Sequence, residues 1–232
     1  MTALLVAHGQ PSDPGPAARA LDALAVRVAG YLPGQAVRAA TLAEPGALAR
    51  ALAGAPGIVL PLFMACGWFS DTHLPARLAE AGGRAWHVLP PLGCAPEVQD
   101  LAVTLAREAA DHGATALVLA AHGSGRSPMP AAVACLVADR IRRETPLSCV
   151  EPAYLDHPPR VADVAGRLPA ASACLPWFAA EGGHVADDLP GLLSAAGFIG
   201  RILPPVGRDP RLPALIARIL ARSLPEQDSL QG

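Results

Sequence analysis

Three polar side chains in the second half of the chain directly follow apolar segments that we expect to be strands. They are His122, Asp156 and His184, after residues 114–121, 147–152 and 172–178. In a parallel α/β sheet the carboxyl ends of the strands meet at one edge, where ligands bind. A neutral imidazole at that edge can bind a divalent metal ion or accept a proton near pH 7. Two imidazoles and a carboxylate together suit Co²⁺, Fe²⁺, Ni²⁺ or Zn²⁺.

Two of these side chains, His122 and Asp156, also have a structural interpretation. His122 can cap the end of a strand by bonding to nearby carbonyl groups, and Asp156 is of the type that begins turns and helices. His157, next to Asp156, is a weaker candidate for the same site. From these residues alone, the ligand-binding and the structural interpretations both stay open.

The elements that must position these side chains alternate between short apolar segments and longer segments rich in Ala, Leu and Arg. Strands are expected at residues 3–7, 57–63, 85–89, 114–121, 147–152, 172–178 and 200–203, with a weaker one at 36–40. Helices are expected at residues 17–30, 45–52, 72–81, 96–111, 130–143, 161–168, 187–196 and 211–223. This alternation predicts βαβ units and parallel sheets.

An internal repeat divides the chain. LVAHG at residues 5–9 recurs as LAAHG at 119–123, and PPLG at 90–93 recurs as PPVG at 204–207, both at an offset of 114. The repeat predicts two tandem α/β lobes, residues 1–112 and 113–224, followed by a tail at 225–232. The first lobe keeps His8 opposite His122, but Phe69 stands opposite His184, so we expect its site to be degenerate.

Composition excludes several classes of protein. The chain has 232 residues, 52% of them hydrophobic and 16% charged, with a net charge of −2, which excludes a disordered chain. It has neither a long uncharged apolar segment nor a basic cluster, so neither a membrane nor a nucleic acid is an expected partner. The P-loop, the GxGxxG fingerprint and the GxSxG elbow are absent. Five cysteines without CxxC spacing, and no signal peptide, indicate a cytoplasmic protein, expected as a monomer or small homo-oligomer.

Three segments resemble the sirohydrochlorin chelatases, the class II chelatases of cobalamin and siroheme synthesis. They are VAHGQ at 6–10, AAHGSG at 120–125 and, most specifically, GGHVADDLP at 182–190. The resemblance covers nearly the whole chain in the long, two-lobe form. It implies a flavodoxin-like lobe duplicated around a cleft for a tetrapyrrole, with metal-site residues at His122, His184 and Asp156. The chain departs from the family at Phe69, because the first lobe of long members as a rule carries the intact site.

The resemblance therefore implies insertion of a divalent metal ion, Co²⁺ before Fe²⁺ or Ni²⁺, into sirohydrochlorin or a related tetrapyrrole. The substrate metal is the only ion expected, and no nucleotide or other cofactor is required. His122 and His184 would hold the ion and accept the pyrrole protons, with Asp156 balancing charge or completing the ligand set. Candidate groups for the substrate's carboxylates are Ser124, Gly125, Arg126, Gly183 and Arg160. The alternatives are that both arginines are ordinary surface residues, that the protein binds a tetrapyrrole or metal without turnover, or that it is a small hydrolase.

Overall fold

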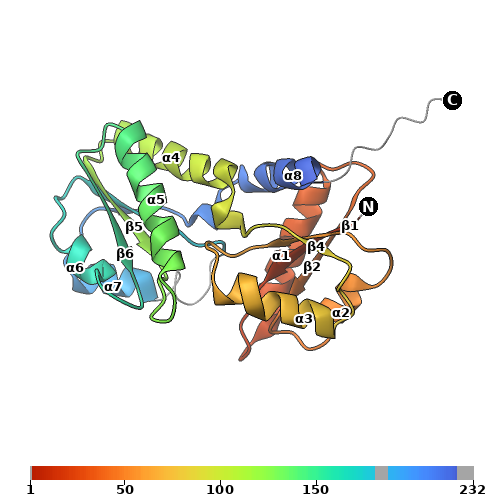
Figure 1. The fold of residues 1–232 in the computed structure, drawn as a ribbon. Helices are drawn as coiled ribbons and strands as arrows, with labels where there is room; N and C mark the ends of the chain where they lie inside the picture. The colour runs from red at the N-terminus through yellow and green to blue at the C-terminus, as the bar shows by residue number, and fades with distance from the viewer. Residues whose placement is uncertain (1, 181–187, 224–232) are drawn as a thin grey trace. The chain divides into compact units, whose positions relative to one another are not determined.

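The computed structural model describes residues 2–180 and 188–223, and the chain divides into two compact units (Figure 1). Unit 1 comprises Met1–Leu62, His73–Pro90 and Pro213–Gly232, and unit 2 comprises Phe63–Thr72 and Pro91–Leu212. Each unit contains one four-stranded parallel sheet flanked by helices. The predicted α/β class with a duplicated parallel sheet is therefore confirmed.

The first sheet has the strand order β2-β1-β3-β4. Its strands are β1 (Thr2–Ala7), β2 (Ala36–Thr41), β3 (Ile58–Pro61) and β4 (His87–Val88). The helices between them are α1 (Pro14–Ala29), α2 (Ala47–Leu52) and α3 (Leu74–Glu80), and a π-helical turn, Phe69–His73, leads into α3. In the central strand β1, residues 3–6 are apolar and buried, as expected for a parallel strand covered on both faces.

The second sheet repeats this order as β6-β5-β7-β8. Its strands are β5 (Ala116–Ala121), β6 (Cys149–Tyr154), β7 (Ser172–Pro176) and β8 (Arg201–Ile202). Two long helices, α4 (Pro96–Asp111) and α5 (Met129–Glu144), cover one face, and the short α6 (Val161–Ala165) and α7 (Leu189–Ala195) cover the other (Figure 1). All six residues of β5 are buried, as expected for a parallel strand between two helical layers.

Alternate residues of the second sheet build the core beneath α6 and α7. Val118 and Ala120 of β5 point to this side and pack in one cluster with Val164 of α6 and Leu193 of α7, all fully buried or nearly so. Because successive side chains of a strand point to opposite faces, the same strand also supplies apolar groups to the α4 and α5 side. The sheet is thereby held as a rigid support for the loops at its carboxyl end.

The predicted elements are all found, with small differences at their ends. The helix predicted at residues 96–111 matches α4, and proline occupies the first or second helical position of α1, α3, α4, α5 and α7. Strands β4 and β8 are shorter than predicted because each pairs with its neighbour over only two residues. None of the described helices is long and apolar enough to cross a membrane.

Two helices belong to a different unit from the one that the predicted lobe boundary gives them. Helix α4 precedes the predicted boundary at residue 112 but contacts α5 and β7 in unit 2. The last helix, α8 (Leu212–Ser223), follows that boundary but belongs almost wholly to unit 1. Each predicted lobe thus contains one complete sheet but lacks a helix that groups with that sheet. The predicted tail at residues 225–232 lies outside the described residues.

Candidate functional site

The carboxyl end of the second sheet brings His122 and Asp156 together. His122 follows β5 and Asp156 follows β6, which are neighbouring parallel strands. The backbone N–H groups of Leu155 and Asp156 both donate to the His122 carbonyl, at 3.2 and 3.1 Å, so the two loops are joined before any side chain is considered. His122 Nδ1 lies 3.2 Å from Asp156 Oδ2, and both side chains are 47% exposed.

This geometry determines how the imidazole can act. In the neutral tautomer with the proton on Nδ1, which faces Asp156, Nε2 is the ring nitrogen that carries the lone pair, so it is the atom able to bind a metal ion or a proton. The arrangement is that of a metal-ligating or proton-accepting histidine oriented by a carboxylate.

Gly123 allows a second histidine to pack closely against the His122 loop. Its backbone has a φ of +77°, and a Cβ there would lie 2.8 Å from Nε2 of His157. The His157 ring stacks on Tyr154 with centroids 4.3 Å apart, and its Nδ1 lies 2.7 Å from the Pro158 carbonyl oxygen. Tyr154 itself is 3% exposed, and burial, followed by its hydrogen bond with Cys135, raises its pKa. These contacts fix the His157 ring beside Gly123.

Four of the five residues predicted to meet substrate carboxylates lie in the same two loops. The Ser124 hydroxyl oxygen accepts hydrogen bonds from the N–H groups of Arg126 and Ser127, at 3.1 and 3.2 Å, and so shapes the loop after His122. Gly125 and Arg126 are exposed, and no described atom lies within 4 Å of where a Cβ on Gly125 would be. Arg160 uses Nη1 to bind the Leu155 carbonyl at 2.8 Å, and its remaining donors are on an exposed side chain.

Two predicted residues, His184 and Gly183, lie outside the described residues. Within residues 2–180 and 188–223, no three His, Cys, Asp or Glu side chains gather into a metal-binding group. Of the predicted metal ligands, the structure therefore brings together the pair His122 and Asp156.

The first sheet ends in a related backbone arrangement with different side chains. His8 follows β1, and its carbonyl accepts the N–H of Ala43 at 2.9 Å, the bond that Asp156 makes to His122 in the second sheet. Gly9 has a φ of +75° and packs against Thr41 and Ala43, as Gly123 packs against Tyr154 and His157. By this correspondence, Ala43 occupies the place of the carboxylate. From the sequence alone, the segment before Pro45 offers Thr41 or Glu44 for this place, not Ala43.

The structure also places a second histidine close to His8. His73 ends the π-helical turn before α3, and both residues belong to unit 1. Burial and, second, the charge of His73 lower the pKa of His8 below its ordinary 6.5. The sequence does not reveal this placement, because the repeat aligns Phe69 with His184 and therefore sets His73 opposite Asp188, which is not a predicted site residue.

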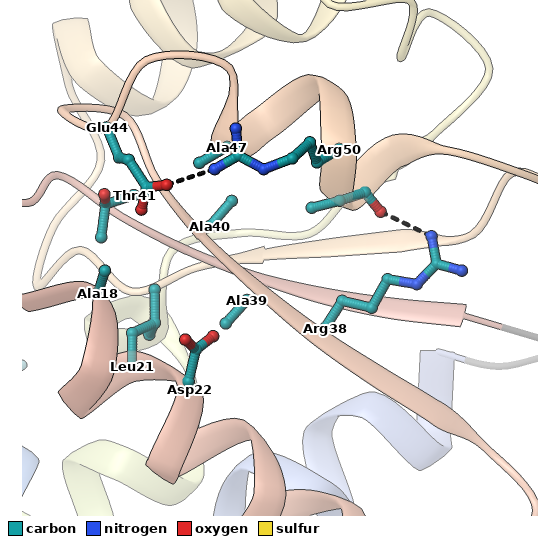
Figure 2. A pocket seen from close by; sticks show the side chains of 11 residues that line it. Ala18, Leu21, Asp22, Arg38, Ala39, Ala40, Thr41, Glu44, Ala47 and Arg50 are labelled. Atoms are coloured by element: carbon teal, nitrogen blue, oxygen red, sulfur yellow. Dashed lines mark hydrogen bonds and ion pairs between the residues drawn. The ribbon is translucent and has the colours of Figure 1, made fainter. Parts of the chain in front are cut away.

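A separate pocket of about 390 Å³ lies in unit 1 beside the edge strand β2, between α1 and α2 (Figure 2). Arg38 donates to the carbonyls of Ala51 and Ala53, and Arg50 forms an ion pair with Glu44. The guanidinium groups of Arg38 and Arg50, which both line the pocket, are thus bonded to other groups of the protein. None of the residues predicted for the metal or substrate site lines this pocket.

Comparison with known proteins gives a consistent result. The CbiX family model matches residues 116–223, which include His122, Asp156 and His184. A solved structure described as CbiX, the terminal enzyme for biosynthesis of siroheme in denitrifying bacteria, is 44% identical. The match covers 97% of this chain and 100% of that chain, with a TM-score of 0.90.

Two further structures share the fold at lower identity. SirB from Bacillus subtilis with Fe³⁺ is 16% identical, with a TM-score of 0.75, over 96% of this chain and 94% of that chain. The sirohydrochlorin chelatase SirB from Bacillus subtilis subspecies spizizenii in complex with cobalt is 18% identical, with a TM-score of 0.68 and the same coverage. No curated protein matches the chain.

Proposed function

This chain belongs to the CbiX family of metal chelatases, and we propose that it inserts a divalent metal ion into sirohydrochlorin or a related tetrapyrrole without a nucleotide. The observation that carries the proposal is the pair of His122 and Asp156, 3.2 Å apart at the carboxyl end of the second sheet. The pair lies within the residues that match the family.

We place the reaction at the second sheet rather than at the first. The family match begins at residue 116 and contains every residue of the proposed metal set, His122, Asp156 and His184. In the first sheet, Ala43 stands at the place of the carboxylate and Phe69 is aligned with His184. The alternative centre is His8 with His73, and the variants described below distinguish the two.

Metal insertion requires an ion that is held weakly enough to leave, and acceptors for two pyrrole protons. In the proposed mechanism His122 and His184 hold the substrate ion through imidazole nitrogen and accept protons as the ion moves to the macrocycle. Asp156 orients His122 through Nδ1 and balances charge or completes the ligand set. A nucleotide is not needed for these steps, in keeping with the absence of a P-loop from the sequence.

The substrate's carboxylates require donors around the same edge of the sheet. Arg126 and Arg160 are exposed on the loops after β5 and β6, so guanidinium groups are available next to the His122 and Asp156 pair. Guanidinium binds carboxylate through two parallel hydrogen bonds, which would fix the orientation of the macrocycle. The backbone N–H groups of Ser124, Gly125 and Gly183 complete the proposed set.

The choice of metal ion is part of the proposal. Imidazole and carboxylate ligands suit Co²⁺, Fe²⁺ and Ni²⁺ alike, so selection among them is set by geometry and availability. The relative at 44% identity is described as an enzyme of siroheme biosynthesis, which supports Fe²⁺ as a substrate beside the expected Co²⁺. We also propose a cytoplasmic location, which the five free thiols support.

The test is anaerobic absorbance spectroscopy of sirohydrochlorin with Co²⁺, Fe²⁺ or Ni²⁺ and catalytic amounts of protein. We expect many turnovers with the wild type and loss of turnover in His122→Ala and His184→Ala. His112→Ala is the matched control, because His112 is exposed at the end of α4 and bonds the Glu108 carbonyl. A spectral shift limited to one event per protein molecule would instead identify a non-catalytic binder.

A further inference from the structure

Two cysteines of unit 2 lie with their sulfur atoms together. Cys66 follows β3 in the Phe63–Thr72 segment, and Cys94 ends the short 3₁₀ turn Leu92–Cys94. Their Sγ atoms are 3.1 Å apart, although 28 residues separate them in the chain. Both side chains are half-buried, so an oxidant can reach them from solvent.

The backbone around the two thiols is held on both sides. The Gly93 N–H donates to the Phe63 carbonyl at 3.0 Å, and a Cβ on Gly93 would lie 2.1 Å from the Met64 carbonyl oxygen. Met64 also accepts a hydrogen bond from the indole N–H of Trp177, at 3.3 Å. The two segments are therefore in backbone contact one residue before Cys94 and two or three residues before Cys66. Bringing the sulfurs together requires no further ordering of the chain.

The other three cysteines have different neighbours. Cys174 is fully buried in the core, Cys149 lies near Glu151, and Cys135 lies 3.4 Å from the Tyr154 hydroxyl. In the second half of the repeat, Arg208 stands at the position of Cys94, directly after the PPVG segment. The thiol pair is thus a local feature of the 63–72 and 91–95 segments, and the duplicated scaffold does not require it.

We propose that Cys66 and Cys94 form a reversible intramolecular disulfide, which makes this pair a site of oxidative modification. The oxidant is a low-molecular-weight disulfide. The Cys66 thiolate attacks one of its sulfurs and releases one thiol, leaving a mixed disulfide on Cys66. The Cys94 thiolate then attacks Cys66 Sγ, forms the protein disulfide and releases the second thiol. The two cysteines together lose two electrons and two protons, and the external disulfide is reduced to two thiols.

The environment of Cys94 determines how the closing step depends on pH. Burial, and then the hydrogen bond with Cys66, raise the pKa of Cys94 to about 12. The hydrogen bond is lost once Cys66 is in the mixed disulfide, but burial, the larger cause, remains and keeps the Cys94 thiolate scarce at neutral pH. Since the thiolate is the attacking species, closure should accelerate as the pH rises. This step depends on neither the metal nor the tetrapyrrole, so the inference stands independently of the proposed function.

The test uses the reduced full chain, oxidised glutathione as the oxidant, alkylation of the remaining thiols and peptide mapping. Trypsin cleaves after arginine, so residues 51–77 carry Cys66 alone and residues 85–107 carry Cys94 alone. We expect these two peptides to be disulfide-linked in the wild type, with the other three cysteines alkylated, and to separate after reduction. Cys135→Ser is the matched control and should keep the link, whereas Cys66→Ser and Cys94→Ser should lose it.

The wild-type map decides the question even if a variant fails to fold. Alkylation of all five thiols after oxidation, a link between other cysteines, or a persistent glutathione adduct on Cys66 would overturn the proposal. A closure rate that rises between pH 7 and pH 9 would support the assigned role of Cys94. A rate independent of pH over that range would contradict that role.

Discussion

The carboxyl ends of the two sheets share a backbone plan and differ in the group next to the first histidine. In both, a His-Gly pair follows the central strand, and the histidine carbonyl accepts an N–H from the loop after the neighbouring strand. That loop residue is Asp156 in the second sheet and Ala43 in the first. The first sheet has the imidazole of His73 near His8 instead.

The difference shows that one scaffold can place two equivalent histidines next to different groups, a carboxylate in one sheet and an imidazole in the other. A carboxylate beside an imidazole favours its protonated form, and a second imidazole disfavours it. His122 thus has a carboxylate oxygen 3.2 Å from its Nδ1, whereas burial and His73 lower the pKa of His8. Duplication has preserved the loop geometry and changed the electrostatics.

The largest expected effect comes from removing one histidine at a time. His122→Ala should lower the rate of metal insertion by about 100-fold or more, because it removes a proton acceptor and a metal ligand together. His8→Ala should stay within a few-fold of the wild type. Initial rates from absorbance spectroscopy measure both. If His8→Ala proves the more damaging variant, the reaction belongs to the first sheet.

A smaller effect is expected from the carboxylate. Asp156→Asn keeps the shape of the side chain but removes the carboxylate charge beside Nδ1 of His122, which orients the imidazole. Loss of such a supporting group typically costs about 10- to 100-fold in activity or metal affinity. Steady-state rates with Co²⁺ and Fe²⁺ provide the measurement. An Asn variant with the full rate would show that Asp156 has only a structural role.

The glycines of the two His-Gly pairs test whether the shared backbone plan matters equally in both sheets. A Cβ on Gly123 would lie 2.8 Å from His157, and a Cβ on Gly9 would lie 2.8 Å from Cβ of Thr41. Each residue also has a positive φ, so each Gly→Ala variant should lose about 1–3 kcal/mol of unfolding free energy. Urea denaturation measures this loss. Only Gly123→Ala should also slow metal insertion, and equal slowing by Gly9→Ala would contradict the assignment to the second sheet.

The smallest effect concerns the titration of His8. Burial is the larger cause of its lowered pKa and His73 the smaller, so His73→Ala should raise that pKa toward 6.5 without reaching it. Imidazole NMR signals followed against pH give the value. An unchanged pKa would mean that His73 has no electrostatic influence on His8.

The lowered pKa of His8 also determines how the unfolding free energy of the protein depends on pH. The pKa of His8 is lower in the folded than in the unfolded chain, so the unfolded chain binds the proton first as the pH falls. The contribution of His8 to the unfolding free energy is therefore complete above pH 6.5 and is lost as the pH falls toward the folded value. Urea denaturation at several pH values should show a smaller loss in His73→Ala than in the wild type.

The strands and most helices could be predicted because their signals are local. Residues 116–121 form an uninterrupted apolar segment, and α4 begins at a proline and ends before Gly113, so both elements are evident from the sequence. The pairing of His122 with Asp156 was also predictable, since both follow neighbouring parallel strands. Because β5 and β6 are parallel neighbours, the residues that follow them lie close together in space.

The remaining features depend on information that is not local. The sequence does not reveal that Ala43 corresponds to Asp156, because the spacing in the two halves differs by one residue. Ala43 lies 35 residues after His8, whereas Asp156 lies 34 residues after His122. The position of His73 depends on the π-helical turn before α3, which has no clear sequence signal. The repeat also cannot tell which sheet each of α4 and α8 joins, because both helices present apolar faces of similar character.

The grouping of α4 with unit 2 and of α8 with unit 1 has a consequence for dividing this protein. A fragment that ended at residue 112 would separate α4 from α5 and β7, the elements of unit 2 that it contacts. The complementary fragment would retain α8 without the sheet of its unit. A division at residue 112 would therefore part each of these two helices from the sheet of its own unit. Recombination between relatives should preserve both helices together with both sheets.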